Sequence, residues 1–339
     1  MNPEYIEQIS NSWWPYIISF FIVVISVIRN YMGGPQCPSK TRMDGKTVLI
    51  TGASGGIGFE TAKELAARGA TVILTCRNFE NGQKATAKIK RYCRQAKIDV
   101  KLLDVSDMSA IRRFSVLMKQ NYKKIDVLIN NAGIVFHPFK WTSEGFELTL
   151  ATNYLGPFLL THMLLPLLKK SDNGRIINLT SVAHSSGRIN LNDMNLEKRF
   201  LERDAFSQSK LALILFTRHV AKILKDTRVT INCVNPGIVR NTKHLKNSPF
   251  GAGFMAKVST YPWVWLFLKT PKQGAQTVIF AATDPILMNV TGEYLSDCEI
   301  REPGYTAQNA YIAEQLYDKT CSMLQLEKKL ISELGSQMY

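Results

Sequence analysis

Three glycines in the first quarter of the sequence have the spacing of an anion-binding turn. Thr51 is followed by Gly52, Gly56 and Gly58, in the pattern T-G-x-x-x-G-x-G. One glycine allows a sharp turn, one lets backbone approach a bound pyrophosphate, and one lets a helix pack closely on a sheet. The unpaired N–H groups and positive dipole end of that helix then face an anion. The turn predicts a nucleotide phosphate site, although a tight turn without a ligand has the same pattern.

The elements that position this turn are predicted by apolar patterning. Residues 47–51 are apolar and β-branched, and residues 59–68 have helical periodicity. Short apolar strands then alternate with helices to about residue 298, which predicts a single α/β domain with a doubly wound parallel sheet, the Rossmann architecture. Ligands of such sheets bind beyond the carboxyl ends of the strands. The expected strands are 47–51, 71–76, 99–103, 127–130, 175–179, 230–234 and 292–295.

The length and composition allow one full-sized core. The chain has 339 residues, of which 45% are hydrophobic, and this favours one large domain over two small ones. The six cysteines are scattered, without a C-x-x-C pair or a cluster with histidine. We therefore expect reduced cysteines in a cytosol-facing protein, and neither a disulfide framework nor a metal site.

The net charge favours an anionic partner. Lysine and arginine number 42 against 27 acidic residues, a formal charge of +15. Nucleic acid, a membrane surface and a phosphorylated cofactor all suit such a charge. Because the basic residues are spread along the chain rather than gathered in one stripe, we expect no nucleic-acid binding. No feature of the sequence sets the oligomeric state.

An apolar segment near the N-terminus predicts a membrane anchor. Residues 13–28 carry no charge, and residues 13–32 reach the length of about 20 residues that spans a bilayer, with Arg29 at the interface. Glu4 and Glu7 precede this segment and basic residues follow it, so the remainder of the chain is expected in the cytosol. A cleaved signal peptide is the alternative, but it requires a basic start and a small-residue cleavage site, and the sequence has neither.

The sequence as a whole is predicted to have five parts. We expect a tail at 1–12, the anchor at 13–32, a linker at 33–41, the domain at 42–325 and a second tail at 326–339. A lid segment at about 240–270 follows the sixth expected strand, and residues 250–268 within it are unusually apolar and aromatic. This stretch is either a buried helix or an apolar lid or second membrane contact.

The residues at the ends of the expected strands form a recognisable series. It comprises the glycine-rich turn, N-N-A-G at 130–133, Asn153, Ser181, S-Q-S-K at 207–210 and P-G at 236–237. This series resembles the short-chain dehydrogenase/reductase family, and the stretches at 150–171, 181–189, 209–217 and 269–277 resemble its microsomal retinol dehydrogenases. The resemblance covers about residues 42–325. It implies a membrane-anchored oxidoreductase that interconverts a lipophilic alcohol and an aldehyde or ketone.

Arg77 favours NADP(H) over NAD(H) as the cofactor. It follows the second expected strand, where an acidic residue would bind a ribose 2′-hydroxyl, and a guanidinium suits a 2′-phosphate instead. The alternative is an exposed arginine at the end of a strand. By resemblance, Asp104 contacts the adenine, and Thr242 stands in for a hydroxyl that the family has slightly earlier. The expected cofactor-binding set is Gly52, Ser54, Gly56, Ile57, Gly58, Arg77, Asp104, Asn131, Ala132, Gly133, Lys210, Pro236, Gly237, Ile238 and Thr242.

The catalytic set implied by the resemblance lacks one functional group. Asn153, Ser181 and Lys210 stand at the family's positions, but Phe206 occupies the position of the tyrosine that moves the proton. Loss of a positioned acid or base typically costs about 100-fold to 10,000-fold in rate. Ser207 leaves the helix about 100° away from Phe206, so it is a poor replacement. A water ordered by Lys210 and Asn153 is a less efficient proton source.

Two functions follow from this sequence. The first is a membrane-anchored NADP(H)-dependent oxidoreductase for a retinoid-like substrate, with activity weakened by Phe206. The second is an inactive NADP(H)-binding protein that acts as a scaffold, sensor or lipid-binding protein. The resemblance implies the endoplasmic reticulum membrane, while a lipid droplet or the mitochondrial outer membrane remains open. His162 and His184 are expected to be helix or loop histidines without a catalytic role.

Overall fold

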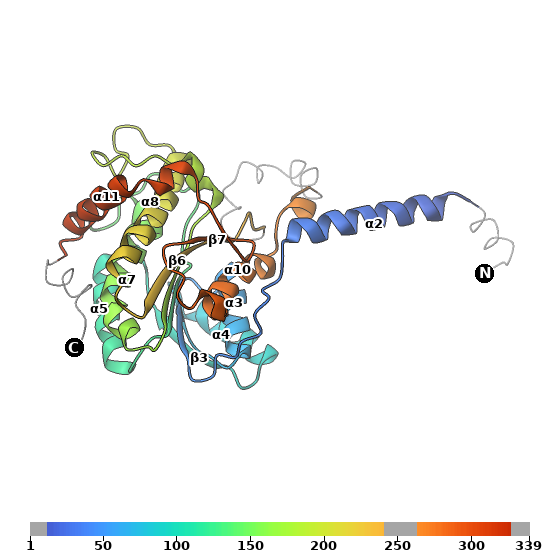
Figure 1. Cartoon of the computed structure of the whole chain (residues 1–339), viewed down its shortest axis with the longest axis horizontal. Coiled ribbons are helices and arrows are strands. Elements are labelled where there is room, and N and C mark those ends of the chain that lie inside the picture. The colour runs from blue at the N-terminus through green and yellow to red at the C-terminus, as the bar shows by residue number, and fades with distance from the viewer. Residues whose placement is uncertain (1–11, 241–262, 327–339) are drawn as a thin grey trace.

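One sheet runs through the folded domain (Figure 1). The computed structural model describes residues 12–240 and 263–326. The strands are β1 Thr47–Ile50, β2 Thr71–Cys76, β3 Lys97–Leu102, β4 Val127–Asn130, β5 Gly174–Leu179, β6 Val229–Asn235, β7 Tyr294–Ser296 and β8 Glu299–Arg301, in the order β3-β2-β1-β4-β5-β6-β7-β8. All neighbouring pairs are parallel except β7 and β8. The predicted doubly wound parallel sheet is thereby confirmed.

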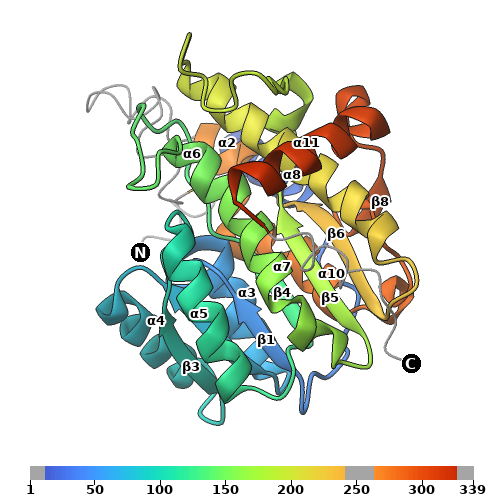
Figure 2. The ribbon, with the colours of Figure 1, turned by 90° about the vertical axis from the view of Figure 1, so that its left-hand side faces the viewer.

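Helices cover both faces of the sheet (Figure 2). One face packs against α3 Gly56–Ala67, α4 Phe79–Tyr92 and α10 Pro271–Thr283, and the other against α5 Met108–Asn121, α7 Gly156–Lys169 and α8 Glu202–Ile223. The C-terminal α11 Ala310–Met323 lies on α8. Shorter helical pieces are α6 Leu148–Leu150, η1 Ala151–Leu155, η2 Val182–Ser186, η5 Pro285–Leu287 and η6 Tyr305–Gln308.

The central strands are buried on both faces, as their continuous apolar sequences predict. Val48, Leu49 and Ile50 of β1 have no exposed surface. They alternate between the two cores, because successive side chains of a strand point to opposite faces. The strand order reverses between β1 and β4, so the carboxyl ends of these two strands border the crevice in which such sheets bind ligands.

The eighth strand was absent from the prediction. β8 pairs with β7 in an antiparallel hairpin whose turn residues, Asp297 and Cys298, have φ angles of 53° and 57°. Hairpin turns with two positive φ angles usually contain glycine or asparagine, so this sequence lacked the usual indication. The three residues of β8 are exposed, which also removed the apolar pattern by which the other strands were found.

The predicted anchor is a helix, α2 Trp14–Gly33, that projects from the domain (Figure 1). It is the one helix among the described residues that is long and apolar enough to cross a membrane, and only 6% of the span is buried. A signal sequence meets the same criteria of length and composition. Gly33 belongs to the helix rather than to the expected linker.

Candidate active site

The glycine-rich turn at residues 51–58 connects β1 to α3. Its backbone forms an open, concave surface, here called the glycine cradle. Gly52 and Gly56 have φ angles of 65° and 59°, which only glycine adopts without strain. Gly55 is the N-cap residue of α3 and offers no side-chain cap, so the first N–H groups of the helix are open to a ligand. Ser54 and Ile57 flank this opening and are partly exposed.

The packing beneath the cradle tolerates no larger residue at two of the glycines. A Cβ atom on Gly58 would lie 2.4 Å from Nδ2 of Asn131 and 2.9 Å from the Gly52 carbonyl oxygen, and one on Gly52 would lie 3.0 Å from Cα of Ala132. The chain after β4 therefore lies directly against the turn. A flat backbone surface at a helix N-terminus fits a pyrophosphate, so the residues present suit a dinucleotide.

Hydrogen bonds of Asn131 and Thr51 hold the turn against the chain after β4. The Asn131 side chain donates hydrogen bonds to the carbonyl oxygens of Thr51 (2.7 Å) and Gly52 (3.2 Å). Thr51 Oγ1 accepts the N–H groups of Asn131 (3.0 Å) and Ala132 (2.9 Å) in return. The amide of Asn131, expected to line the cofactor, is thus occupied in holding the two loops together. Ala132 and Gly133 continue from there toward the interior.

Arg77 and Asp104 lie at the ends of neighbouring strands. Arg77 follows β2 and is exposed, just before the Asn78 side chain that caps α4. Asp104 follows β3, and its Oδ1 accepts hydrogen bonds from the Ser106 N–H (2.9 Å) and Oγ (2.7 Å). Because β2 and β3 are parallel and adjacent, both residues lie at the same edge of the sheet as the glycine-rich turn.

Asn153 lies in an irregular turn of helix. Residues 151–155 form the π-helical η1 between α6 and α7, a distortion often found at functional sites. The Asn153 side chain is fully buried, accepts the Ile134 N–H (2.8 Å) and donates to the Ile134 carbonyl (2.9 Å) and to Ser209 Oγ (3.0 Å). It therefore joins the chain after β4 to α8.

Lys210 reaches from α8 into the same region. Its Nζ donates to the Leu179 carbonyl oxygen at 2.8 Å, and a Cβ built on Gly133 would lie 3.6 Å from Nζ and 3.1 Å from Oδ1 of Asn153. Gly133, Asn153 and Lys210 are thus brought together. The lysine is only 7% exposed, and burial lowers its pKa to about 8.

Phe206 lies one helical turn before Lys210. Its ring is buried, packs edge-to-face on Phe136 with centroids 5.6 Å apart, and lies 5.9 Å from the Lys210 nitrogen. Ser207 points elsewhere, because its hydroxyl donates to the Arg203 carbonyl within the helix at 2.7 Å. The phenylalanine thus supplies ring packing at this position and no group that exchanges a proton.

Ser181 ends the extended chain after β5 and caps η2. Its Oγ accepts the Ala183 N–H at 3.3 Å. His184 secures the same turn, since Nδ1 donates to the Ser181 carbonyl (2.7 Å) and Nε2 accepts the Gly304 N–H (3.0 Å). Burial lowers the pKa of His184. Its contacts join Ser181 to the loop before η6, a positioning contact that the sequence did not indicate.

The other residues singled out from the sequence lie after β6, outside the described residues or in the core. Pro236, Gly237 and Ile238 follow β6, where Gly237 has a φ angle of 77° and Asn235 Oδ1 accepts its N–H at 3.1 Å. Thr242 and most of the expected lid lie outside the described residues. His162 lies in the core, where it contacts Tyr317 at 2.9 Å and burial lowers its pKa to about 4.

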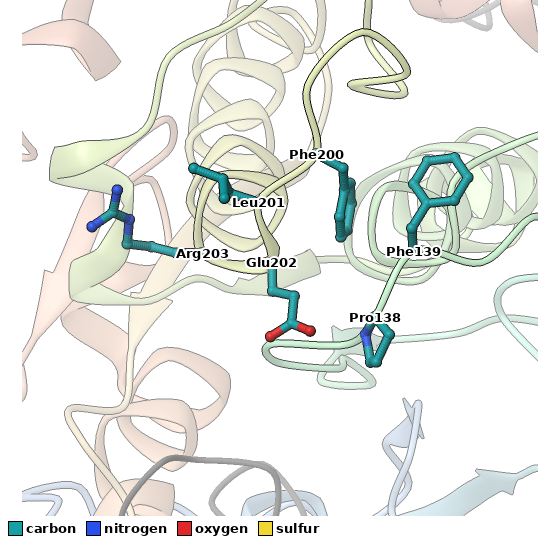
Figure 3. A pocket seen from close by; sticks show the side chains of 6 residues that line it. All are labelled: Pro138, Phe139, Phe200, Leu201, Glu202 and Arg203. Carbon is teal, nitrogen blue, oxygen red and sulfur yellow. The ribbon is translucent and has the colours of Figure 1, made fainter.

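A hollow of about 600 Å³ with a mixed apolar and charged lining opens between residues 138–139 and residues 200–203 (Figure 3). The rings of Phe139 and Phe200 meet edge-to-face in it, 5.0 Å apart, while Arg203 points away from them. Its lining is Pro138, Phe139, Phe200, Leu201, Glu202 and Arg203. The sequence did not indicate these residues, because four of them lie in irregular stretches without periodicity and the other two, Glu202 and Arg203, are only the first residues of α8.

Comparison with known proteins agrees with this architecture. Residues 46–250 match the family model described as short chain dehydrogenase. The chain is 41% identical over 307 residues to retinol dehydrogenase 12 of Bos taurus, which covers 91% of this chain and 95% of that protein. It is 38% identical over 316 residues to retinol dehydrogenase 11 of Mus musculus, with 92% and 96% covered.

A solved structure of another protein, which contains a bound nucleotide, has a similar fold. A short chain dehydrogenase from Shigella flexneri, complexed with NADP, has a TM-score of 0.61 and 25% identity, and the match covers 77% of this chain and all of that one. The glycine cradle, the strand order and these matches together define a nicotinamide-dinucleotide oxidoreductase fold. The chain belongs to the short-chain dehydrogenase family.

Proposed function

We propose that this protein is a membrane-anchored, NADP(H)-dependent oxidoreductase of lipophilic alcohols and aldehydes or ketones, retinoids among them, with turnover weakened by Phe206. The observation that carries the proposal is the convergence of Gly133, Asn153 and Lys210 beside the glycine cradle. The retinol dehydrogenase names of the relatives support the substrate class. The rings of Phe139 and Phe200 in the hollow support it as well, because a lipophilic chain needs an apolar wall.

The residues of the chain take separate parts in this chemistry. A bound nicotinamide ring supplies hydride exchange at the substrate carbon. Lys210 binds the ribose hydroxyls beside that ring, and Ser181 holds the substrate oxygen by a hydrogen bond. Pro236, Gly237 and Ile238, which follow β6, would hold the carboxamide of that ring. A proton must reach the same oxygen in the same step, and with Phe206 in place it comes from a water held near Lys210.

Exposed Arg77 supports the preference for NADP(H). It lies at the carboxyl end of β2, on the side of the sheet where the adenosine ribose of a dinucleotide rests. A planar guanidinium binds a phosphate through two parallel hydrogen bonds, whereas a ribose hydroxyl gains little from it. The NADP bound to the Shigella flexneri relative is consistent with this choice.

The anchor is proposed to hold the domain at the cytosolic face of the endoplasmic reticulum. The exposed apolar surface of α2 has no partner in the folded domain along most of its length, which a bilayer would supply. The basic residues that follow the helix in sequence favour the cytosolic side for the domain. Alkaline carbonate extraction of cell membranes, with protease added before and after lysis, tests both statements.

The matched pair Phe206→Tyr and Lys210→Ala tests the enzymatic function. With NADPH and a panel of lipophilic aldehydes, we expect slow turnover by the native chain and a rise of about 100-fold to 10,000-fold in Phe206→Tyr, because the tyrosine restores a positioned proton donor. Lys210→Ala should abolish turnover in both backgrounds. Native turnover indistinguishable from that of Lys210→Ala would contradict the proposal.

The second candidate is an NADP(H)-binding protein without turnover. It is favoured by one observation, the packing of Phe206 against Phe136 and beneath Lys210, which fills the tyrosine position with an apolar ring. The cofactor cradle does not depend on that ring. Activity in Phe206→Tyr alone, with equal NADPH affinity in both proteins, would support this candidate and make the native chain a scaffold, sensor or lipid-binding protein.

A further inference from the structure

The base of α2 is fastened to a short aromatic helix of the domain. Arg29, in the last turns of α2, donates hydrogen bonds to the Leu268 carbonyl (3.0 Å) and to Gln273 Oε1 (3.1 Å). Its guanidinium also lies 5.6 Å from the ring centroid of Trp265. Residues 263–267 are helical, so Arg29 binds a carbonyl just beyond the C-terminal end of that helix, where cations are favoured.

This helix presents large apolar side chains to the exterior. Trp263 is 63% exposed, Trp265 38% and Phe267 41%. The rings of Trp263 and Phe267 are stacked, with centroids 5.9 Å apart, so they form one continuous surface. A soluble domain rarely exposes neighbouring aromatic side chains of this size, and tryptophan is enriched at membrane–water interfaces.

The hydrogen bond between Arg29 and the Leu268 carbonyl sets the depth of these aromatic side chains in the bilayer. If α2 crosses the bilayer, as in the proposed function, its one charged residue lies at the interface. The Leu268 carbonyl is bonded to that residue, so the helix at residues 263–267 lies at the same level. The aromatic surface is therefore placed where the acyl chains meet the headgroups.

The charge of this region suits phospholipid headgroups. Of the described residues in this part of the chain, Arg240, Lys269 and Lys272 are basic and none is acidic, although Lys269 is paired with Asp297. Arg240 is close enough for its charge to act on Arg29, and its Nε is buried without a hydrogen-bond partner among the described residues. Two guanidinium groups near each other are stabilised by a phosphate, and basic residues near an anionic leaflet strengthen binding to it.

We propose that Trp263, Trp265 and Phe267, with Arg29 and Arg240 beneath them, form a second membrane contact that inserts at the headgroup level of the bilayer holding α2. This inference rests on the proposed anchoring. The same segment pairs with the chain after β6, where the Ile238 carbonyl accepts the Lys269 N–H (2.9 Å) and the Lys269 carbonyl accepts the Arg240 N–H (2.8 Å). The contact therefore holds the expected nicotinamide side of the site against the membrane, where a lipophilic substrate is dissolved.

Tryptophan quenching by brominated phospholipids tests this contact in the full-length chain. One protein keeps Trp263 and has the other four tryptophans replaced by phenylalanine. The control has all five replaced and carries Tyr311→Trp, at a 68% exposed position on α11, which lies on the side of the domain away from α2 (Figure 1). Both are reconstituted in vesicles of phosphatidylcholine and phosphatidylserine with bromine near the carbonyl end of the acyl chains.

We expect loss of most of the Trp263 fluorescence and none of the control fluorescence. Arg29→Gln in the Trp263 protein should reduce the quenching, because the fastening is lost while the apolar length of α2 remains. Flotation and carbonate extraction of the same samples report insertion of α2 separately. Inserted protein in which Trp263 is quenched no more than the control would overturn the second contact alone, whereas failure to insert would overturn the anchoring and the contact together.

Discussion

Cofactor binding and proton movement are both proposed to depend on Lys210. Its nitrogen is buried, is bonded to the Leu179 carbonyl, and has the apolar ring of Phe206 where the family pattern has a phenol. In that pattern the lysine lowers the pKa of the tyrosine. Here the lysine has no such partner, and its own pKa falls to about 8 through burial. Its free base is therefore present at mildly alkaline pH.

The low pKa of Lys210 predicts a pH-dependent cost to stability. Below pH 8 the buried amine must be charged in the folded state, whereas the unfolded chain keeps its proton up to the ordinary pKa of 10.5. The unfolded state binds more protons between these two values, so the native chain gains stability as pH rises through that window, by about 3 kcal/mol at most. Lys210→Met removes this dependence, because its side chain has no charge.

Urea unfolding at pH 7.5 and pH 9.5 measures this effect. We expect Lys210→Met to have its largest stability advantage over the native chain at pH 7.5 and a smaller one at pH 9.5. Comparing the two proteins at each pH cancels the titration of other groups. An advantage that stays constant between the two pH values would show that burial does not shift the lysine.

Arg77 gives a prediction about cofactor selectivity. Arg77→Ala should weaken NADPH binding by about 10-fold to 100-fold, the loss of one or two charge-assisted hydrogen bonds, and leave NADH binding nearly unchanged. Equilibrium titration of the four pairs of protein and nucleotide measures this. Equal weakening of both nucleotides would count against a 2′-phosphate site. Arg203→Ala, which removes an exposed arginine that lines the hollow at residues 138–139 and 200–203, is the matched control.

At the scale of elements, the conformation of the turn between β1 and α3 is held by close contact with the chain after β4. Asn131 and Thr51 join the two loops by four hydrogen bonds. Lys210 meets Gly133 after β4 and Leu179 at the end of β5, and β1 lies next to β4 in the sheet. Small residues in these loops are therefore part of the site even where they carry no functional group.

Two glycines of the turn provide a matched pair of substitutions. Gly58→Ala places a Cβ within 3.0 Å of three atoms, two of them backbone, and should destabilise the domain by about 1–3 kcal/mol. Gly55→Ala meets nothing within 4 Å and has an extended φ of −170°, so it should leave the unfolding free energy unchanged. Thermal unfolding without nucleotide makes the comparison, and equal effects of the two alanines would contradict this packing.

The parts of the fold found from sequence are those with local patterns. The apolar runs of β1, β2 and β4 and the glycine-rich turn were predicted within one residue, because burial on both faces leaves a continuous pattern. β8 was missed because it is short and exposed. The domain boundaries and the assigned roles of the site residues remain predictions.

The parts of the site that sequence did not reveal depend on distant contacts. Phe136 has a φ angle of 47°, unusual for an aromatic residue, and reaches Phe206 across the carboxyl end of the sheet. Nothing near residue 136 in the sequence indicates this. The partners of Arg29 likewise lie more than 230 residues further along the chain. Such pairs are set by topology, which a periodic pattern does not specify.

In the whole molecule, the proposed membrane helix lies beside the proposed aromatic contact, and the proposed nucleotide site lies on the other side of that contact. Arg29 links the first two, and the pairing of Lys269 with the chain after β6 links the last two. If α2 spans the bilayer as proposed, a domain fastened in this way faces the membrane with its expected substrate side. Lipophilic substrate would then reach the nicotinamide without crossing water.

Titration of the purified full-length chain in detergent with NADPH and NADH is the most direct measurement of the central claim. We predict saturable NADPH binding that is tighter than NADH binding and equal in the native chain and Phe206→Tyr, since the ring at that position does not form the cradle. No affinity of the native chain for either nucleotide, oxidised or reduced, would contradict the account.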